Sequence, residues 1–223
     1  MAVKRILFLI IAAALLSVAT WQAARAGLAR NKVDRGMRAA DVDLIRQGAA
    51  ISPHDAETQY ALGYAMQETR NYEDALQAFQ RAVELRPRDY YLWMRYGIMR
   101  EATGDQAGAE RALRESVLMA PHYARPHWQL GNLLLRMGKY DEAFAELRQA
   151  ANTGAELFPS VIDLAWNVYG KDAQRVVDVL RPDTDAAHMA LALFFVRHRE
   201  PQQATRQFQA IKGGPPPETE VLQ

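Results

Sequence analysis

The chain contains no cysteine, and this absence removes several kinds of site at once. None of its 223 residues carries a thiol, so the sequence excludes disulfide bonds, thiolate metal sites, cysteine nucleophiles and a lipidated cysteine. The cellular compartment stays open on this evidence.

Catalytic and metal-binding motifs are also missing. The sequence has no His-Glu-x-x-His, no phosphate-cradling glycine loop and no Gly-x-Ser-x-Gly. His54 and His122 each follow a proline that recurs with a fixed period, which indicates turn residues, and the spacing of His122 and His127 is poor for one helical face. The sequence therefore predicts no enzyme, no metal site and no cofactor.

Positive charge is scarce over most of the chain. Residues 1–38 hold seven lysines and arginines against one aspartate, whereas the remaining residues hold 20 against 25 acidic side chains. Nucleic-acid binding needs positive charge over the docking surface, so the acidic body argues against a nucleic-acid partner. The basic segment flanks an apolar run, which favours anionic lipid as its partner.

Charge is absent from Ile6 to Trp21, directly after two basic residues. As a helix this run spans roughly 24 Å, somewhat less than a typical hydrocarbon core of about 30 Å. It fits an uncleaved membrane anchor with Trp21 at the interface, or a signal peptide cut after Ser17-Val18-Ala19 or Ala24-Arg25-Ala26. A buried helix of a soluble domain is disfavoured because the run has no polar face. We favour an anchor or signal segment over residues 1–26, with the anchor first.

The charges beside this run disagree about orientation. Lys4 and Arg5 favour a cytoplasmic N-terminus, whereas five basic residues within 17 positions of Trp21 favour the opposite. A very short N-terminal flank before an apolar run is the usual layout for export. We therefore expect a single-pass protein of a bacterial inner membrane with a periplasmic body, and a cleaved, secreted form as the alternative.

A period of 34 residues orders the rest of the sequence. Glycine, alanine, a large apolar residue and proline each recur at this step: Gly63, Gly97 and Gly131; Ala75, Ala109 and Ala143; Phe79, Leu113 and Leu147; Pro53, Pro87 and Pro121. Such a period is typical of a helical repeat array. Glycine inside a helix costs up to about 1 kcal/mol relative to alanine, so its recurrence indicates helices that approach too closely for a methyl group.

Each unit is expected to form two helices. The first unit has one helix beginning at 60–65, a polar turn at 69–71 and a second helix at 72–85. The equivalent turns at 103–105 and 137–139 contain Gly104 and Gly138, a residue type suited to the left-handed position after a helix. The recurring prolines end the second helices.

These positions resemble the tetratricopeptide repeat over residues 56–89, 90–123 and 124–157. The matches are Leu62, Gly63, Ala75, Phe79, Ala82 and Pro87, then Trp93, Gly97, Ala109 and Pro121, then Leu130, Gly131, Ala143 and Ala150. The first unit lacks the initial tryptophan, and the third has Ala155 in place of the closing proline. The resemblance implies an all-α fold: a right-handed superhelical solenoid of antiparallel helix pairs, here preceded by one N-terminal transmembrane helix.

Weaker repeats are expected on both sides. Residues 27–55 fit a degenerate leading repeat or connector whose first helix continues from the membrane helix, because Ile45 and Pro53 lie one period before Phe79 and Pro87. Residues 158–212 fit two degenerate C-terminal repeats, with helices near 160–169 and 172–180 in the first of them. Residues 213–223 read as a flexible Pro/Gly tail.

The resemblance also implies a binding surface, since first helices line the concave face where partners of this family bind. The corresponding positions are Tyr60, Tyr64, Tyr91, Met94, Arg95, Ile98, Arg125, Trp128, Asn132 and Arg136. Aromatic residues and arginine are enriched at interface hot spots. The alternative is that Tyr60, Met94 and Trp128 only pack between helices. The family's clamp for a C-terminal carboxylate matches here only at Asn132.

We therefore expect a non-catalytic, membrane-tethered scaffold that binds a peptide or helix of a partner protein in the concave groove. Anchored arrays of this kind resemble accessory proteins of bacterial envelope systems, including polysaccharide export, cytochrome maturation and pilus assembly. Two alternatives belong to other classes. One is an accessory subunit or fragment of a glycan-handling enzyme system, and the other is a structural oligomer that stacks through its end repeat.

Overall fold

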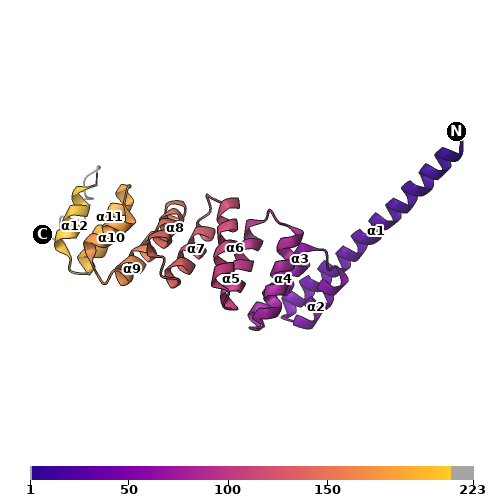
Figure 1. Cartoon of the computed structure of the whole chain (residues 1–223), viewed down its shortest axis with the longest axis horizontal. Coiled ribbons are helices and arrows are strands. Elements are labelled where there is room, and N and C mark those ends of the chain that lie inside the picture. Colours follow the sequence, from indigo (N-terminus) through magenta and orange to yellow (C-terminus); the bar gives the residue numbers. More distant parts are fainter. Residues whose placement is uncertain (1, 212–223) are drawn as a thin grey trace. The chain divides into compact units, whose positions relative to one another are not determined.

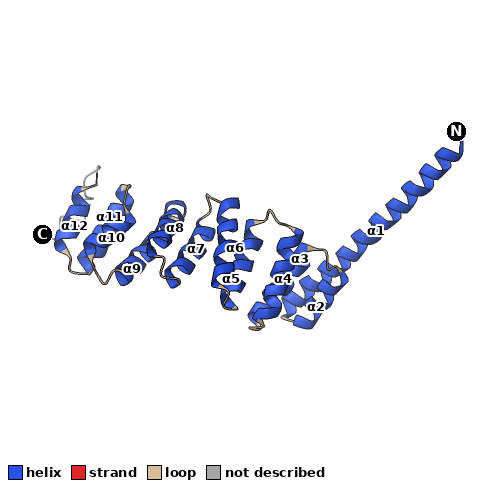
Figure 2. Cartoon of the chain, viewed as in Figure 1, coloured by secondary structure: helices blue, strands red, loops and turns tan. Residues whose placement is uncertain are grey.

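The computed structural model describes residues 2–211, and these form helices joined by short turns, with no strand in that range (Figure 2). Their bounds in chain order are α1 Ala2–Ala39, α2 Val42–Ile51, α3 Ala56–Glu68, α4 Tyr72–Leu85, α5 Tyr90–Ala102, α6 Gln106–Met119, α7 Ala124–Arg136, α8 Tyr140–Thr153, the 3₁₀ helix η1 Ala155–Leu157, α9 Phe158–Val168, α10 Ala173–Leu180, α11 Asp185–Arg197 and α12 Pro201–Gln209. The predicted all-α class is confirmed.

The helices divide into two compact units, which we call unit 1 (Met1–Met119) and unit 2 (Ala120–Gln223). In unit 1, α1 packs with α2, α3 with α4 and α5 with α6, and the pairs follow one another along the chain (Figure 1). Phe79 and Met99 lie in its main apolar core. In unit 2, α7 packs with α8 and α11 with α12, around a core that includes Phe144, Trp166 and Phe195.

The recurring glycines mark the closest approach within a helix pair. A Cβ atom on Gly131 would lie 2.7 Å from Cγ of Leu147 and 3.1 Å from the carbonyl oxygen of Ala143. On Gly97 it would lie 2.8 Å from Cγ of Leu113. The close approach predicted from the sequence is confirmed, and the space at each glycine is filled by the large side chain of the second helix.

The α1–α2 pair uses the same principle with different residues. A Cβ on Gly36 would lie 2.6 Å from Cγ1 of Ile45, and one on Gly48 would lie 2.6 Å from Cγ2 of Val33. Each helix therefore contributes a glycine that receives a β-branched side chain of the other. This reciprocal arrangement could not be read from the main repeat, where the glycine lies on the first helix alone.

Helix α1 runs without a break from the apolar run into this pair. Phe8 and Leu16 are 71% and 68% exposed, whereas Ala29 is fully buried against its neighbours. The stretch is long and apolar enough to cross a membrane, and its most apolar window has no buried residue. A signal sequence would satisfy the same criteria of length and composition. One rigid element thus joins the apolar segment to the packed helices of unit 1.

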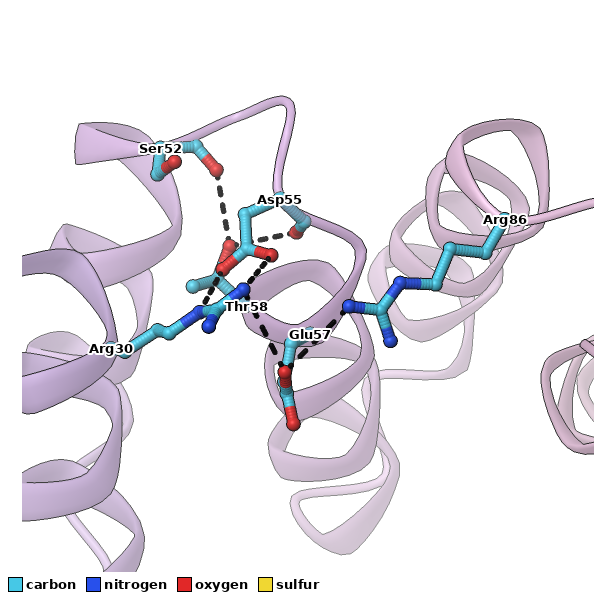
Figure 3. A network of polar contacts seen from close by, with 6 residues as sticks. All are labelled: Arg30, Ser52, Asp55, Glu57, Thr58 and Arg86. Carbon is cyan, nitrogen blue, oxygen red and sulfur yellow. Dashed lines mark hydrogen bonds and ion pairs between the residues drawn. The ribbon is translucent and has the colours of Figure 1, made fainter. Parts of the chain in front are cut away.

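A network of polar contacts joins the C-terminal half of α1 to α3 (Figure 3). Arg30 donates from Nε to Oδ2 of Asp55 at 2.9 Å and from Nη2 to Oδ1 at 3.0 Å. The hydrogen bond from Arg30 holds the pKa of Asp55 below its usual value. Nη2 of Arg30 and Nη2 of Arg86 each lie 3.8 Å from Oε2 of Glu57. The network therefore connects α1, the start of α3 and the end of α4.

One hydrogen bond recurs at the turns that precede α3, α5 and α7. A side-chain nitrogen faces the carbonyl oxygen of the proline six residues earlier, at 3.5 Å for Gln59 and Pro53, 2.9 Å for Trp93 and Pro87, and 3.0 Å for His127 and Pro121. The three side chains are one period apart and chemically different. For His127 the bond requires the proton on Nε2.

The turns within the helix pairs follow the sequence prediction in two cases of three. Gly104 and Gly138 have φ of 89° and 74°, the left-handed conformation expected after a helix. Arg70 takes this position in the first full unit with φ of 60° and no glycine. The left-handed turn is therefore kept although the residue type changes.

The third unit ends differently from the first two. Ala155, which stands in place of the closing proline, begins η1, and α9 follows directly from Phe158. The helices expected at 160–169 and 172–180 correspond to α9 and α10, with α9 beginning two residues earlier. The expected tail at 213–223 lies outside the described residues.

Replacing Gly131 by alanine is expected to lower the free energy of unfolding by up to about 2 kcal/mol. Overpacking against Leu147 costs about 1–3 kcal/mol, and the better helix propensity of alanine returns only about 1 kcal/mol. Urea denaturation followed by circular dichroism measures the change. Gly27→Ala is the control, because its new Cβ has nothing within 4 Å; equal stability of the two variants would contradict the prediction.

Candidate functional site

Five of the ten predicted groove residues come together on two helices of unit 1. Tyr60 and Tyr64 lie on α3, and Tyr91, Arg95 and Ile98 lie on α5. The hydroxyl oxygens of Tyr60 and Tyr91 are 3.3 Å apart, and their ring centroids are 5.7 Å apart. The guanidinium carbon of Arg95 lies 5.6 Å from the ring centroid of Tyr64. Direct contacts between α3 and α5 therefore link four of the five side chains.

Arg95 has the most unusual environment of this set. It is only 8% exposed, and its guanidinium carbon also lies 5.4 Å from the ring centroid of Phe79. Nη2 donates a hydrogen bond to Oε1 of Gln67, but the buried Nε has no acceptor. Among the residues that the structure describes, no carboxylate pairs with it. A buried charge without a counter-ion is costly, so Arg95 lacks an acceptor that its position requires.

Arg100 on the same helix shows the ordinary arrangement. Its guanidinium carbon lies 4.8 Å from the ring centroid of Tyr96, and Nη1 lies 2.8 Å from Oδ2 of Asp105. Both arginines have a buried Nε without an acceptor. Only Arg100, however, has a carboxylate to balance its charge.

Tyr60 is held in its neutral form by its surroundings. Burial, followed by the hydrogen bond with Tyr91, raises the pKa of Tyr60 to about 12. The positive charge of Arg95 acts in the opposite direction. The two tyrosine hydroxyls therefore remain a hydrogen-bonded pair at neutral pH, next to the guanidinium of Arg95.

Two predicted residues of α5 contribute little accessible surface. Met94 has no exposed area, although it lies one period after the half-buried Tyr60. It offers a partner no surface without rearrangement. Ile98 packs partly against the main core of unit 1 and is accessible over the remainder of its side chain.

The other four predicted residues lie on α7 of unit 2. Arg125 and Arg136 are exposed, and Trp128 packs partly against the core of unit 2. Nδ2 of Asn132 donates to the carbonyl oxygen of Trp128 at 2.8 Å, so this amide is partly occupied within its own helix. Within the α7 set, this hydrogen bond therefore joins Trp128 and Asn132.

The sequence prediction missed two residues that hold Arg95 in place. Gln67 accepts its hydrogen bond, and Phe79, which was assigned only to packing, also lies against its guanidinium. Gln67 is seven residues after Tyr60 and so lies on the same helical face. That spacing could have identified Gln67, whereas the second role of Phe79 had no signal in the sequence.

The part of the chain that the structure describes contains no group of three or more histidine, aspartate or glutamate side chains able to hold a metal ion. His127 has a structural role in place of metal binding. Its Nδ1 lies 2.6 Å from Oε2 of Glu146 on α8, and its Nε2 faces the turn at Pro121. This buried histidine therefore joins α7 to α8.

Tyr60 is expected to stay protonated up to about pH 12 in the folded chain, whereas an unfolded tyrosine ionises near pH ~10. Between these values the unfolded state binds fewer protons, so the stability contributed by neutral Tyr60 falls as the pH rises. Tyr91→Phe should move the Tyr60 titration down towards its ordinary value. Ultraviolet difference titration against matching Tyr60→Phe chains measures this, and Tyr72→Phe serves as the exposed control. An unchanged Tyr60 titration in Tyr91→Phe would refute the assignment.

The sequence of this chain is similar to known tetratricopeptide-repeat proteins. Family models described as "Tetratricopeptide repeat" match residues 56–89 and 124–152. The chain is 27% identical over 109 residues to the peroxisomal targeting signal receptor of Candida albicans, and 32% identical over 95 residues to the TPR repeat-containing thioredoxin TTL4 of Arabidopsis thaliana. These matches cover 47% and 43% of this chain but 18% and 14% of those proteins. The chain thus spans less than a fifth of the curated relatives it matches.

Two solved structures share the fold. PilF of Pseudomonas aeruginosa has a TM-score of 0.57 at 16% identity, over 91% of this chain and 97% of that one. MamA has a TM-score of 0.54 at 16% identity, over 79% of this chain and 90% of that one. Identity this low shows the fold alone. Together with the period of 34 residues, the helix pairs and the two family matches, it shows that the chain is a tetratricopeptide-repeat protein.

Proposed function

We propose that this protein is a non-catalytic scaffold, tethered to a membrane by α1, that binds an acidic segment of a partner protein on α3 and α5. The observation that carries the proposal is the buried guanidinium of Arg95, which has no carboxylate partner among the described residues. A glutamate or aspartate of the partner supplies the missing acceptor. Tyr60, Tyr64 and Tyr91 offer aromatic surface to the apolar side chains beside it.

The energetics favour the bound state specifically at Arg95. An exposed arginine exchanges water for a carboxylate with little net gain. Arg95 has already lost most of its water in the free protein, since it is 8% exposed. The cost of desolvating this cation is therefore met on folding, and an arriving carboxylate gains a charge-assisted hydrogen bond without that cost. Such a site selects carboxylates over amides of the same shape.

The comparisons support a protein-binding role. One curated relative is named as a receptor for a targeting signal, and two segments of this chain match tetratricopeptide-repeat models. In unit 2, Arg125, Trp128, Asn132 and Arg136 on α7 offer a partner aromatic and cationic groups of the same kind. We therefore propose a peptide or helix as the ligand, with Arg95 as its main polar contact.

The proposed tether is the exposed apolar part of α1. Its large apolar side chains from Ile6 to Trp21 are 50–71% exposed, and an apolar surface of this length is suited to lipid. The guanidinium of Arg25 lies 5.2 Å from the ring centroid of Trp21, a pairing suited to the interface. We place the repeats on the periplasmic side of a bacterial inner membrane, because the N-terminal flank is short and basic.

Replacing Arg95 by methionine is expected to abolish selective binding of acidic peptides while the fold stays at least as stable. Methionine fills a similar volume, and exchanging a buried unpaired charge for an apolar side chain is neutral or stabilising by about 1–4 kcal/mol. The test is a peptide array whose members differ only by glutamate against glutamine. Wild type should prefer the glutamate members about tenfold or more, and Arg95→Met should show no preference.

Arg88→Met is the matched control, since it removes an exposed arginine just before α5 and should leave the preference intact. Thermal unfolding separates a binding role from a structural one. A large loss of stability in Arg95→Met would mean that the arginine is required for packing. An unchanged glutamate preference in a folded Arg95→Met chain would refute the proposed site.

The membrane tether is tested separately by alkaline extraction of membranes from cells that express the full chain. A membrane-spanning α1 keeps the protein in the pellet, and mass spectrometry should find residues 1–26 attached. Replacing Leu9 and Leu15 by lysine should release the protein, because each central charge costs about 2.5–3.5 kcal/mol on insertion scales. Release of the wild-type chain, or cleavage after residue 19 or 26, would contradict the tether and leave the peptide-binding site unaffected.

A further inference from the structure

Unit 2 contains a cavity of about 590 Å³ that neither the repeat packing nor the proposed peptide site explains. It is bounded by the end of α8, the beginning of α9 and the segment from Leu180 into α11. Its volume is within the range of small-molecule sites, about 300–1,000 Å³. Apolar or small side chains make up most of the wall: Ala151, Phe158, Leu180, Pro182, Ala187 and Ala190.

Two arginines, Arg148 and Arg181, line the same cavity. Nη1 of Arg148 donates to the carbonyl oxygen of Val179 at 2.5 Å, which fixes the guanidinium at the end of α10. Neither arginine forms an ion pair with a carboxylate in the described range, and Asp183, which also lines the cavity, pairs with neither. The wall is thus mainly apolar and carries two cations together with the carboxylate of Asp183, which forms no ion pair with either arginine.

The two arginines are close enough to affect each other. Burial, and after it the charge of Arg181, lowers the pKa of Arg148. Like charges repel more strongly where water is partly excluded. An anion placed between the two guanidinium groups would remove this repulsion.

The backbone of Arg181 is left-handed, as it also is at Ala40, Arg70, Lys171 and Arg199. It ends α10 in the left-handed conformation, with φ of 49° and ψ of 61°. Glycine adopts this conformation without strain, whereas a residue with a side chain pays about 1 kcal/mol. Arginine therefore occupies a position where glycine would be less strained, and it brings a second positive charge to the cavity.

We infer that this cavity binds a small monocarboxylate with an apolar body. The carboxylate is recognised by Arg148 and Arg181, and the body lies against the apolar wall that includes Phe158 and Leu180. The wall selects against inorganic anions such as phosphate, which have no apolar part, and the arginines select against neutral compounds of the same shape. The inference stands on unit 2 alone and does not depend on the peptide site at Arg95.

The test uses the full chain in lipid nanodiscs and three probes, with empty nanodiscs subtracted. 1-Naphthylacetate carries both the apolar body and the carboxylate, 1-naphthylacetamide carries only the body, and acetate carries only the charge. Isothermal titration calorimetry should show binding of the acid, about tenfold weaker binding of the amide, and none of acetate. Equal affinity for acid and amide, or no binding of the acid, would overturn the inference.

Variants locate the probe. Arg181→Gly removes the cation and suits the left-handed backbone, so it should weaken binding of the acid about tenfold without loss of the fold. Ala190→Leu fills the cavity and should weaken binding of the acid and of the amide to a similar extent. Arg175→Gln is the control, because this arginine of α10 lies over the ring of Tyr169 at 5.7 Å and does not line the cavity. An Arg181→Gly chain that binds the acid as tightly as wild type would refute the site.

Discussion

The contact between a glycine on one helix and a large side chain on the next sets the geometry on which the rest of this protein depends. At Gly131 and Leu147 the space for a methyl group is already occupied by the leucine, and the equivalent contact recurs one period earlier at Gly97 and Leu113. Because this contact fixes the separation within a pair, it also fixes where the remaining face of each first helix lies within its own unit. In unit 1 this arrangement brings Tyr60 of α3 to Tyr91 of α5. The surface proposed for binding thus follows from the requirement that the helices of each pair pack closely.

The junctions between helix pairs share a side-chain N–H donor, although the residue type that supplies it differs. The carbonyl of each proline in these turns accepts a hydrogen bond from a side chain of the next helix, and the donors are an amide at Gln59, an indole at Trp93 and an imidazole at His127. Each reaches back six residues to a proline. This explains how repeats that share few side chains keep one geometry. It also gives His127, which had no assigned role in the sequence, a structural one.

The sequence predicted most of the fold because the fold is periodic. The second helix of the first full unit was placed at 72–85, the observed bounds of α4, and the left-handed glycines at 104 and 138 were also expected. Burial at equivalent positions was less predictable, since it depends on side chains from other helices. Tyr60 and Met94 occupy the same place in the period, yet Tyr60 reaches Tyr91 and Met94 is fully buried. Within residues 2–211, the separation of Arg95 from any carboxylate likewise depends on how three helices pack, and the spacing of residues in the sequence does not indicate it.

A repeat array is well suited to hold costly groups such as Arg95. Its free energy of unfolding is approximately a sum of terms for each unit and for the contacts between neighbouring units. The free-energy cost of burying one cation without a counter-ion is therefore local, and the apolar packing of the surrounding helix pairs offsets it. Phe79 has two roles here: it fills the space at Gly63 within the helix pair, and it lies against the guanidinium of Arg95. Phe79 therefore both stabilises the helix pair and holds the arginine of the proposed site in place. Departures from ideal packing are tolerated where a function uses them, and in unit 1 the departure is found on the helices proposed to contact a partner.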